Sequence, residues 1–205
     1  AVMPFVSIFG YSIFTVHFVA LLYFVLNLLA VFIISKKLLG IKYAVIASAI
    51  FSAFFIDLSL TTETPMIFFG LLGIYAYLSF LKNKKLALML LSGALISVSI
   101  WFKQPGVMFF AAVFFHQIYL KFNREESNIW KNIFVNILGI LIISIPLLFY
   151  FSMISGFWNF INAIIFFNAN LNNSNSRFLI IGKVIFLIIS MFGFLLPLIF
   201  FHPKK

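Results

Sequence analysis

The sequence predicts an all-α membrane protein, a bundle of about seven transmembrane helices. Hydrophobic residues make up 64% of its 205 residues and charged residues only 9%, whereas a soluble domain is about half apolar and about a quarter charged. The apolar residues form continuous runs of about 18 to 23 residues, the length that crosses a bilayer as a helix. Because backbone polar groups need internal partners in lipid, and the runs do not alternate as barrel strands do, the runs are predicted to be helical.

Polar residues and prolines separate the predicted helices. Residues 1–12 are predicted to form a loop or a segment that dips into the membrane. Pro65 and Pro105 each mark the start of a helix, the position that tolerates proline best. The helices are predicted at 13–35, 43–60, 65–81, 86–101, 105–120, 132–151 and 179–201.

Basic residues indicate the orientation in the membrane. Eleven of the fourteen basic residues fall on one side, in loops 36–42, 82–85 and 121–131 and at the C-terminus. Only Lys103, Arg177 and Lys183 fall on the other side. Since cytoplasmic loops carry an excess of Lys and Arg, the first side is predicted to be cytoplasmic, and loops 57–64 and 102–106 extracytoplasmic.

The composition also excludes some partners and cofactors. The net charge of +10 comes from these clusters between apolar runs, so nucleic acid is not a predicted partner. The chain has no cysteine, and therefore no disulfide framework or thiolate metal site. His17, His116 and His202 differ in depth and spacing from a metal-binding pair, so they are interpreted as packed or interfacial, and no metal or other cofactor is predicted.

Polar and small residues inside the helices are interpreted as packing features. Asn27 and Asn136 are predicted to bond a neighbouring helix rather than a ligand. Small residues four apart allow close helix approach, which is expected to bring the two extracytoplasmic loops together. They are Ala44, Ser48 and Ser52 on one helix, and Gly93 and Ser97 on another.

The two extracytoplasmic loops have opposite charge. "DLSLTTETP", residues 57–65, contains Asp57 and Glu63, the only acids on that face, while "WFKQPG", residues 101–106, contains Lys103. Both loops are short, so the helix ends that they join are expected to be neighbours. One interpretation is that these are solvated loop residues, with Lys103 reaching lipid headgroups. The other is that they form a binding site.

The order of several short sequences resembles a known family. The chain carries in turn "FGYS", a helix ending in "KKLLG", a helix leading into "TTETP", a helix ending in "KNKK", and "LLSGALISVSIWFKQPGVMFFAAVFF". Over roughly residues 4–120 this resembles the membrane half of GT-C superfamily glycosyltransferases, in particular the family-39-like protein O-mannosyltransferases and lipid A aminoarabinose transferases. In that family an acid close before a proline opens one helix, here Glu63 before Pro65, and a small-residue-rich helix ends at a lysine, here Lys103.

The resemblance implies transfer of a sugar from a polyprenyl-phosphate carrier to an acceptor, whose identity stays open, at the outer side of the cell envelope. The expected partners are this lipid-linked donor and the membrane lipids. Lys103 would stabilise the leaving phosphate, with Gln104 as a neutral donor. Glu63 would orient the acceptor, hold a cation or position a partner base. Asp57 is a poorer candidate for the same site, and Thr62 would bind a hydroxyl or cap the next helix.

One feature of the family is missing. Its catalytic aspartate, which follows the first membrane helix, has no counterpart in the chain. Residues 1–205 are therefore expected to be a single transmembrane domain from a longer enzyme, without its first helix and loop, and inactive alone. The abundance of Phe, Ile, Lys and Asn suggests a prokaryotic plasma membrane as the location.

Two other function classes stay open. A transporter or flippase fragment would carry charged or broken-helix sites near the membrane midplane, where this sequence has almost no charge. A structural membrane subunit would tolerate changes at Glu63 and Lys103.

Overall fold

The computed structural model describes residues 7–8, 10, 12–54, 63–123, 128–156 and 158–159, and this part of the chain is helical without any strand. Its elements are α2 (Ile13–Leu39), α3 (Ile41–Phe54), α4 (Glu63–Asn83), α5 (Leu86–Phe102), the 3-10 helix η1 (Gln104–Gly106), α6 (Val107–Phe122) and α7 (Ile129–Ser155). The predicted all-α membrane bundle is therefore confirmed.

Six of the seven predicted helices fall wholly or partly within the described ranges, and each is present there. Residues 55–60 of the helix predicted at 43–60 lie outside these ranges. The seventh, at 179–201, lies outside them, as do most of residues 1–12. Among the described residues of that segment, Ser7 and Ile8 are helical. Among the described residues, four helices are long and apolar enough to cross a membrane: Ile13–Leu39, Glu63–Asn83, Gln104–Phe122 and Ile129–Ile154. The apolar helices α3 and α5 are shorter.

The predicted end of the first helix, at residue 35, is wrong by four residues. Helix α2 continues through Lys36 and Lys37 to Leu39 and ends at Gly40, which has a φ of 90°. Lysines in a last helical turn are stabilised by the negative end of the helix dipole. Gly40 adopts the left-handed backbone without steric cost. The lysines are thus part of the helix, and the glycine ends it.

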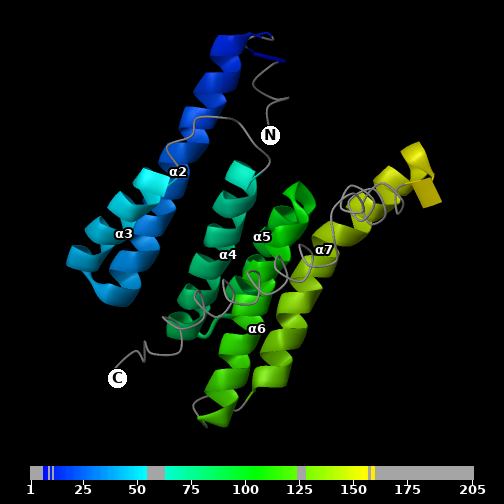
Figure 1. Ribbon diagram of the computed structural model, residues 1–205. Coiled ribbons are helices and arrows are strands. Elements are labelled where there is room, and N and C mark those ends of the chain that lie inside the picture. Colours follow the sequence, from blue (N-terminus) through cyan, green and yellow to red (C-terminus); the bar gives the residue numbers. More distant parts are fainter. Residues whose placement is uncertain are drawn as a thin grey trace, which may run out of the picture.

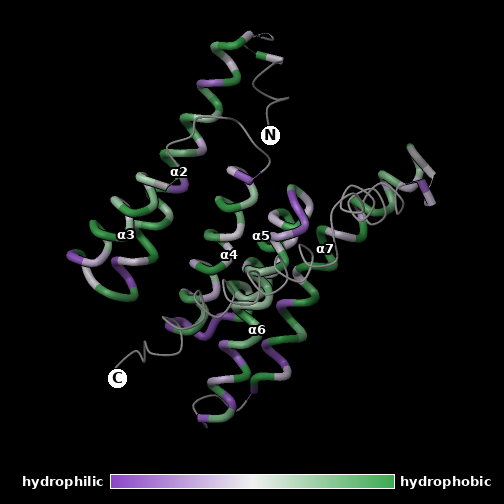
Figure 2. Tube along the Cα trace, viewed as in Figure 1, coloured by the Kyte–Doolittle hydropathy of each residue, from purple (hydrophilic) through white to green (hydrophobic). Residues whose placement is uncertain are grey.

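Helix α5 lies at the centre of the described bundle. It packs against α4 on one side and α7 on another, and also contacts α6, while α2 joins the bundle through α4 and carries α3 on its other side (Figure 1). Hydrophobic residues cover most of each helix, and hydrophilic residues gather towards helix ends, including the turns between α2 and α3 and between α4 and α5 (Figure 2).

Glycines let α5 and α7 pack backbone to backbone. A Cβ atom at Gly93 would overlap the carbonyl group of Asn136, and one at Gly139 would overlap the carbonyl oxygen of Leu90. The predicted close approach at Gly93 is confirmed, but its partner is α7, which carries neither of the two charged loops. The approach of α4 to α5 depends instead on Gly73, whose Cβ would lie 2.7 Å from Ile96 Cγ1.

The asparagines inside helices bond to neighbouring helices, as predicted. Asn136 Nδ2 donates to the carbonyl oxygen of Met89 at 3.2 Å, and Asn27 Nδ2 donates to the carbonyl oxygen of Thr64 at 2.9 Å. His116 is also packed as predicted: it is buried, and its Nδ1 lies 2.6 Å from the hydroxyl oxygen of Tyr77.

Replacing Gly93 by leucine tests the contact between α5 and α7. We expect Gly93→Leu to lower the free energy of unfolding by about 3 kcal/mol, because overpacking a close contact costs roughly that much. Ala87→Leu, on an exposed position of the same helix, is the matched control and should have little effect. The measurement is thermal unfolding of the detergent-solubilised protein; equal midpoints for the two variants would contradict the contact.

Candidate functional site

Glu63 and Lys103 meet at one end of α4 and α5. The Lys103 ammonium donates a hydrogen bond to Glu63 Oε1 and forms an ion pair with it across 40 residues of sequence. The side chains remain 41% and 51% exposed, respectively. The sequence-based expectation that the two charged loops lie together is therefore correct for these two residues. Asp57 and Thr62 lie outside the described residues.

A tight turn fixes the backbone of Lys103. Helix α5 ends at Phe102, and Lys103 is extended, with a φ of −160° and a ψ of 138°. Its amide donates to the Ser99 carbonyl oxygen at 3.3 Å, and its own carbonyl accepts from the Gly106 amide at 2.9 Å. A Cβ atom at Gly106 would lie 2.6 Å from the Ser99 carbonyl carbon. Only glycine lets the chain turn back so closely against α5.

Glu63 stands at the first residue of α4, where the helix dipole favours a carboxylate. Two neighbouring helices hold the start of α4 in place. The buried Asn27 of α2 bonds the Thr64 carbonyl. The buried Ser99 of α5 donates through Oγ to the Met66 carbonyl oxygen at 2.7 Å. Glu63 and Lys103 are therefore held in place by helix packing rather than by loop contacts alone.

Ser99 was not singled out from the sequence. It lies one turn before Lys103 and links α5 to α4 directly beneath the ion pair. A hydroxyl inside an apolar helix needs a hydrogen-bond partner. The position of Ser99 in the sequence therefore indicates a hydrogen bond, but it does not identify the partner helix.

Aromatic rings lie close to the ion pair. Phe69 of α4 and Phe102 of α5 stack with their centroids 5.6 Å apart and their planes at 10°. A Cβ at Gly70 would overlap the Phe109 ring of α6, so α4 and α6 also pack closely. The charged pair thus occupies the exposed end of a packed, apolar helix group.

The exposure of the pair limits its contribution to stability. Exposed ion pairs contribute about 0–1 kcal/mol, so the pair adds little to the free energy of folding. A lysine ammonium has three N–H donors, and Glu63 occupies one of them. The exposed Gln104 lies next in the chain. Among the residues that the structure describes, no group of three His, Cys, Asp or Glu side chains could hold a metal ion.

Sequence comparison identifies the family. The sequence model of the family described as dolichyl-phosphate-mannose-protein mannosyltransferase matches residues 3–150. No curated protein and no solved structure shows significant similarity to the chain. The match extends beyond the predicted resemblance of residues 4–120 and includes most of α7.

The matched segment contains both Glu63 and Lys103 and covers most of the chain. Of the three function classes that the sequence left open, the match supports the membrane glycosyltransferase. The chain belongs to the dolichyl-phosphate-mannose-protein mannosyltransferase family, whose members are GT-C-type integral membrane glycosyltransferases.

Proposed function

We propose that the protein transfers a sugar from a polyprenyl-phosphate-linked donor to an acceptor on the extracytoplasmic side of a prokaryotic membrane, and that Lys103 binds the donor phosphate. The single observation that carries this proposal is the exposed Glu63–Lys103 pair at one helix end of a chain from this family. The cationic group and the acid are fixed in the bundle and still accessible to a ligand.

The chemistry of the donor explains the proposed role of Lys103. As the glycosidic bond breaks, negative charge grows on the phosphate of the lipid carrier. A fixed cation beside that phosphate stabilises the transition state more than the ground state, which is the condition for acceleration. Because Glu63 holds the ammonium in place, part of the entropy cost of orienting the lysine is met before the donor binds.

Two further features support an anion at this end. The exposed Gln104 follows Lys103 in the 3-10 helix η1, where its amide is the proposed neutral donor to the phosphate. Helix α6 begins at Val107, so the positive end of its dipole lies near Lys103 and offsets the negative end of α5, which ends at Phe102.

Glu63 is proposed as a positioning residue for Lys103 and as a ligand for the acceptor. Its Oε1 atom accepts from the Lys103 ammonium, which orients the side chain towards the donor side of the site. Since Glu63 already accepts a hydrogen bond from Lys103, the proton of the acceptor is expected to leave through another group.

Removing the ammonium is the first test. Lys103→Ala should lower kcat for sugar transfer by roughly 10²–10³-fold, the usual loss when a group that stabilises developing negative charge is removed. Lys103→Arg should recover part of the activity because it keeps the charge. The assay is transfer from a purified polyprenyl-phosphate sugar by the full-length protein in membranes. Lys85→Ala, at the other end of α5, is the control. Wild-type rates for Lys103→Ala would remove Lys103 from the site.

Removing only the charge of Glu63 separates positioning from base catalysis. Glu63→Gln should lower kcat by about tenfold and leave the shape of its pH profile unchanged, since Glu63 acts through Lys103. A general base would instead cost up to about 10⁴-fold, and its loss would remove the fall of kcat at acidic pH. Measuring kcat between pH 5 and 9 decides between the two roles.

The proposed orientation can be tested by cysteine labelling, because the chain contains no cysteine of its own. In intact cells, a membrane-impermeant maleimide should label the variant Gln104→Cys. It should label Lys85→Cys only after the membrane is permeabilised. The reverse pattern would place the Glu63–Lys103 pair on the cytoplasmic side and contradict the proposed acceptor side.

A further inference from the structure

A second polar site lies between α2 and α4, at the other end of α4 from Glu63. Helix α4 runs from Glu63 to Asn83, so the two sites are separated by about 30 Å of helix. The site is a groove of 480 Å³ lined by both helices. Lys36 and Lys37 come from the last turn of α2, and Ser79 and Lys82 from the last turns of α4.

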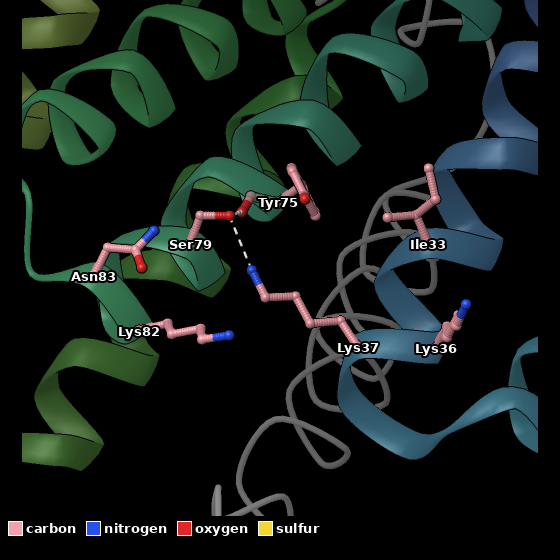
Figure 3. A pocket seen from close by; sticks show the side chains of 7 residues that line it. All are labelled: Ile33, Lys36, Lys37, Tyr75, Ser79, Lys82 and Asn83. Atoms are coloured by element: carbon pink, nitrogen blue, oxygen red, sulfur yellow. Dashed lines mark hydrogen bonds between the residues drawn. The ribbon is translucent and has the colours of Figure 1, made fainter.

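Lys37 crosses the groove. Its ammonium donates to Ser79 Oγ at 2.9 Å and lies 4.6 Å from the centre of the Tyr75 ring. The Ser79 hydroxyl in turn donates to the Tyr75 carbonyl oxygen at 2.8 Å. Figure 3 shows Lys37 reaching from α2 towards Ser79, with Lys82 extending into the same space from α4. The cation is thus fixed by a hydroxyl and an aromatic face, neither of which neutralises it.

The groove carries positive charge that no described acid balances. None of its lining residues is acidic, and Glu63 is the only acid in the described part of the chain. The last turns of α2 and α4 each add about half a negative charge from the helix dipole. Three lysines against roughly one negative charge leave a net positive site.

We propose that this groove binds the phosphate of an anionic phospholipid headgroup. A phosphate group would lie between the Lys37 and Lys82 ammonium groups and offset their mutual repulsion, with Lys36 at the rim. Lysines bind phosphate as point charges, and Asn83 supplies a neutral amide at the same place. The volume suits a headgroup-sized ligand.

The surface beside the groove favours a lipid over a soluble phosphate compound. Ile33 lines the groove and belongs to a row of apolar residues four apart on α2: Leu21, Val25, Leu29 and Ile33, each 42–51% exposed. Residues four apart follow one side of a helix, so this row leads along α2 to the groove. An acyl chain attached to the bound headgroup would lie along the row, whereas a soluble phosphate would leave it unused.

The expected orientation agrees with this ligand. Lys36, Lys37 and Lys82 of the groove belong to the segments 36–42 and 82–85, which the charge pattern assigns to the cytoplasm. Anionic lipids give the cytoplasmic leaflet a negative surface potential that attracts basic clusters.

Lipid titration of the purified full-length protein tests the proposal. The probes are phosphatidylglycerol, phosphatidylcholine with the same acyl chains, and glycerol 3-phosphate, with binding measured by native mass spectrometry. The test variant is K36Q/K37Q/K82Q. The matched control is K42Q/K85Q/K131Q, which removes the same charge from lysines on the same predicted side but outside the groove.

We expect wild type and control to bind phosphatidylglycerol at least tenfold more tightly than phosphatidylcholine, and the test variant to lose that preference. Glycerol 3-phosphate should not compete at equal concentration, because it lacks acyl chains. An equal loss in test and control variants, or full competition by glycerol 3-phosphate, would overturn the proposal. Lys82→Gln alone, at an exposed position, should reduce the preference about threefold, and unchanged binding by this mild variant would also overturn it.

Discussion

Helix α4 lies close enough to α5 for Glu63 to meet Lys103 because Gly73 leaves room for the Ile96 side chain and the Ser92 carbonyl. The Ser99 hydroxyl then bonds the Met66 carbonyl, and Phe69 stacks on Phe102, the residue before Lys103. In lipid, where apolar contact alone does not drive helices together, such small residues and interhelical hydrogen bonds determine which faces pack. The position of the ion pair is therefore a consequence of this helix contact, and the loops only connect the helices.

The two ends of α4 carry different electrostatics. At one end a single acid and a single base meet at an exposed position, so a ligand finds a cation that is already held in place. At the other end, three lysines line a groove that contains no acid. The first arrangement suits a reacting phosphate, because the fixed charge is available without reorganisation. The second suits a permanently bound anion, because a bound anion offsets the net positive charge of the lysines.

Much of the fold follows from run length and charge. The continuous apolar runs predicted six helices that the structure contains, and Pro65 and Pro105 indicated the two helix starts beside the site. The sequence pattern predicts the end of α2 four residues too early, because lysines are typical of loops although a last helical turn also stabilises them.

The candidate site was predictable only in part. Opposite charges on two short loops of one face indicated that Glu63 and Lys103 would be neighbours. Small residues showed that α5 has a close contact but not with which helix: Gly93 packs on α7, and Gly73 of α4 was not singled out. The bond from Ser99 to Met66 was missed because a sequence pattern does not specify interhelical partners. The roles of Asp57 and Thr62 remain predictions from the family resemblance.

Crosslinking in the membrane tests the central claim most directly, which is that residues 63 and 103 lie side by side. The double variant Glu63→Cys/Lys103→Cys, in a chain without other cysteines, is treated with a short thiol crosslinker and then with a polyethylene-glycol maleimide. The structure predicts that crosslinking protects both thiols. The two thiols of the reference pair Glu63→Cys/Lys85→Cys are separated by most of the length of α5 and should still react with the maleimide. Equal modification of both pairs would contradict the account.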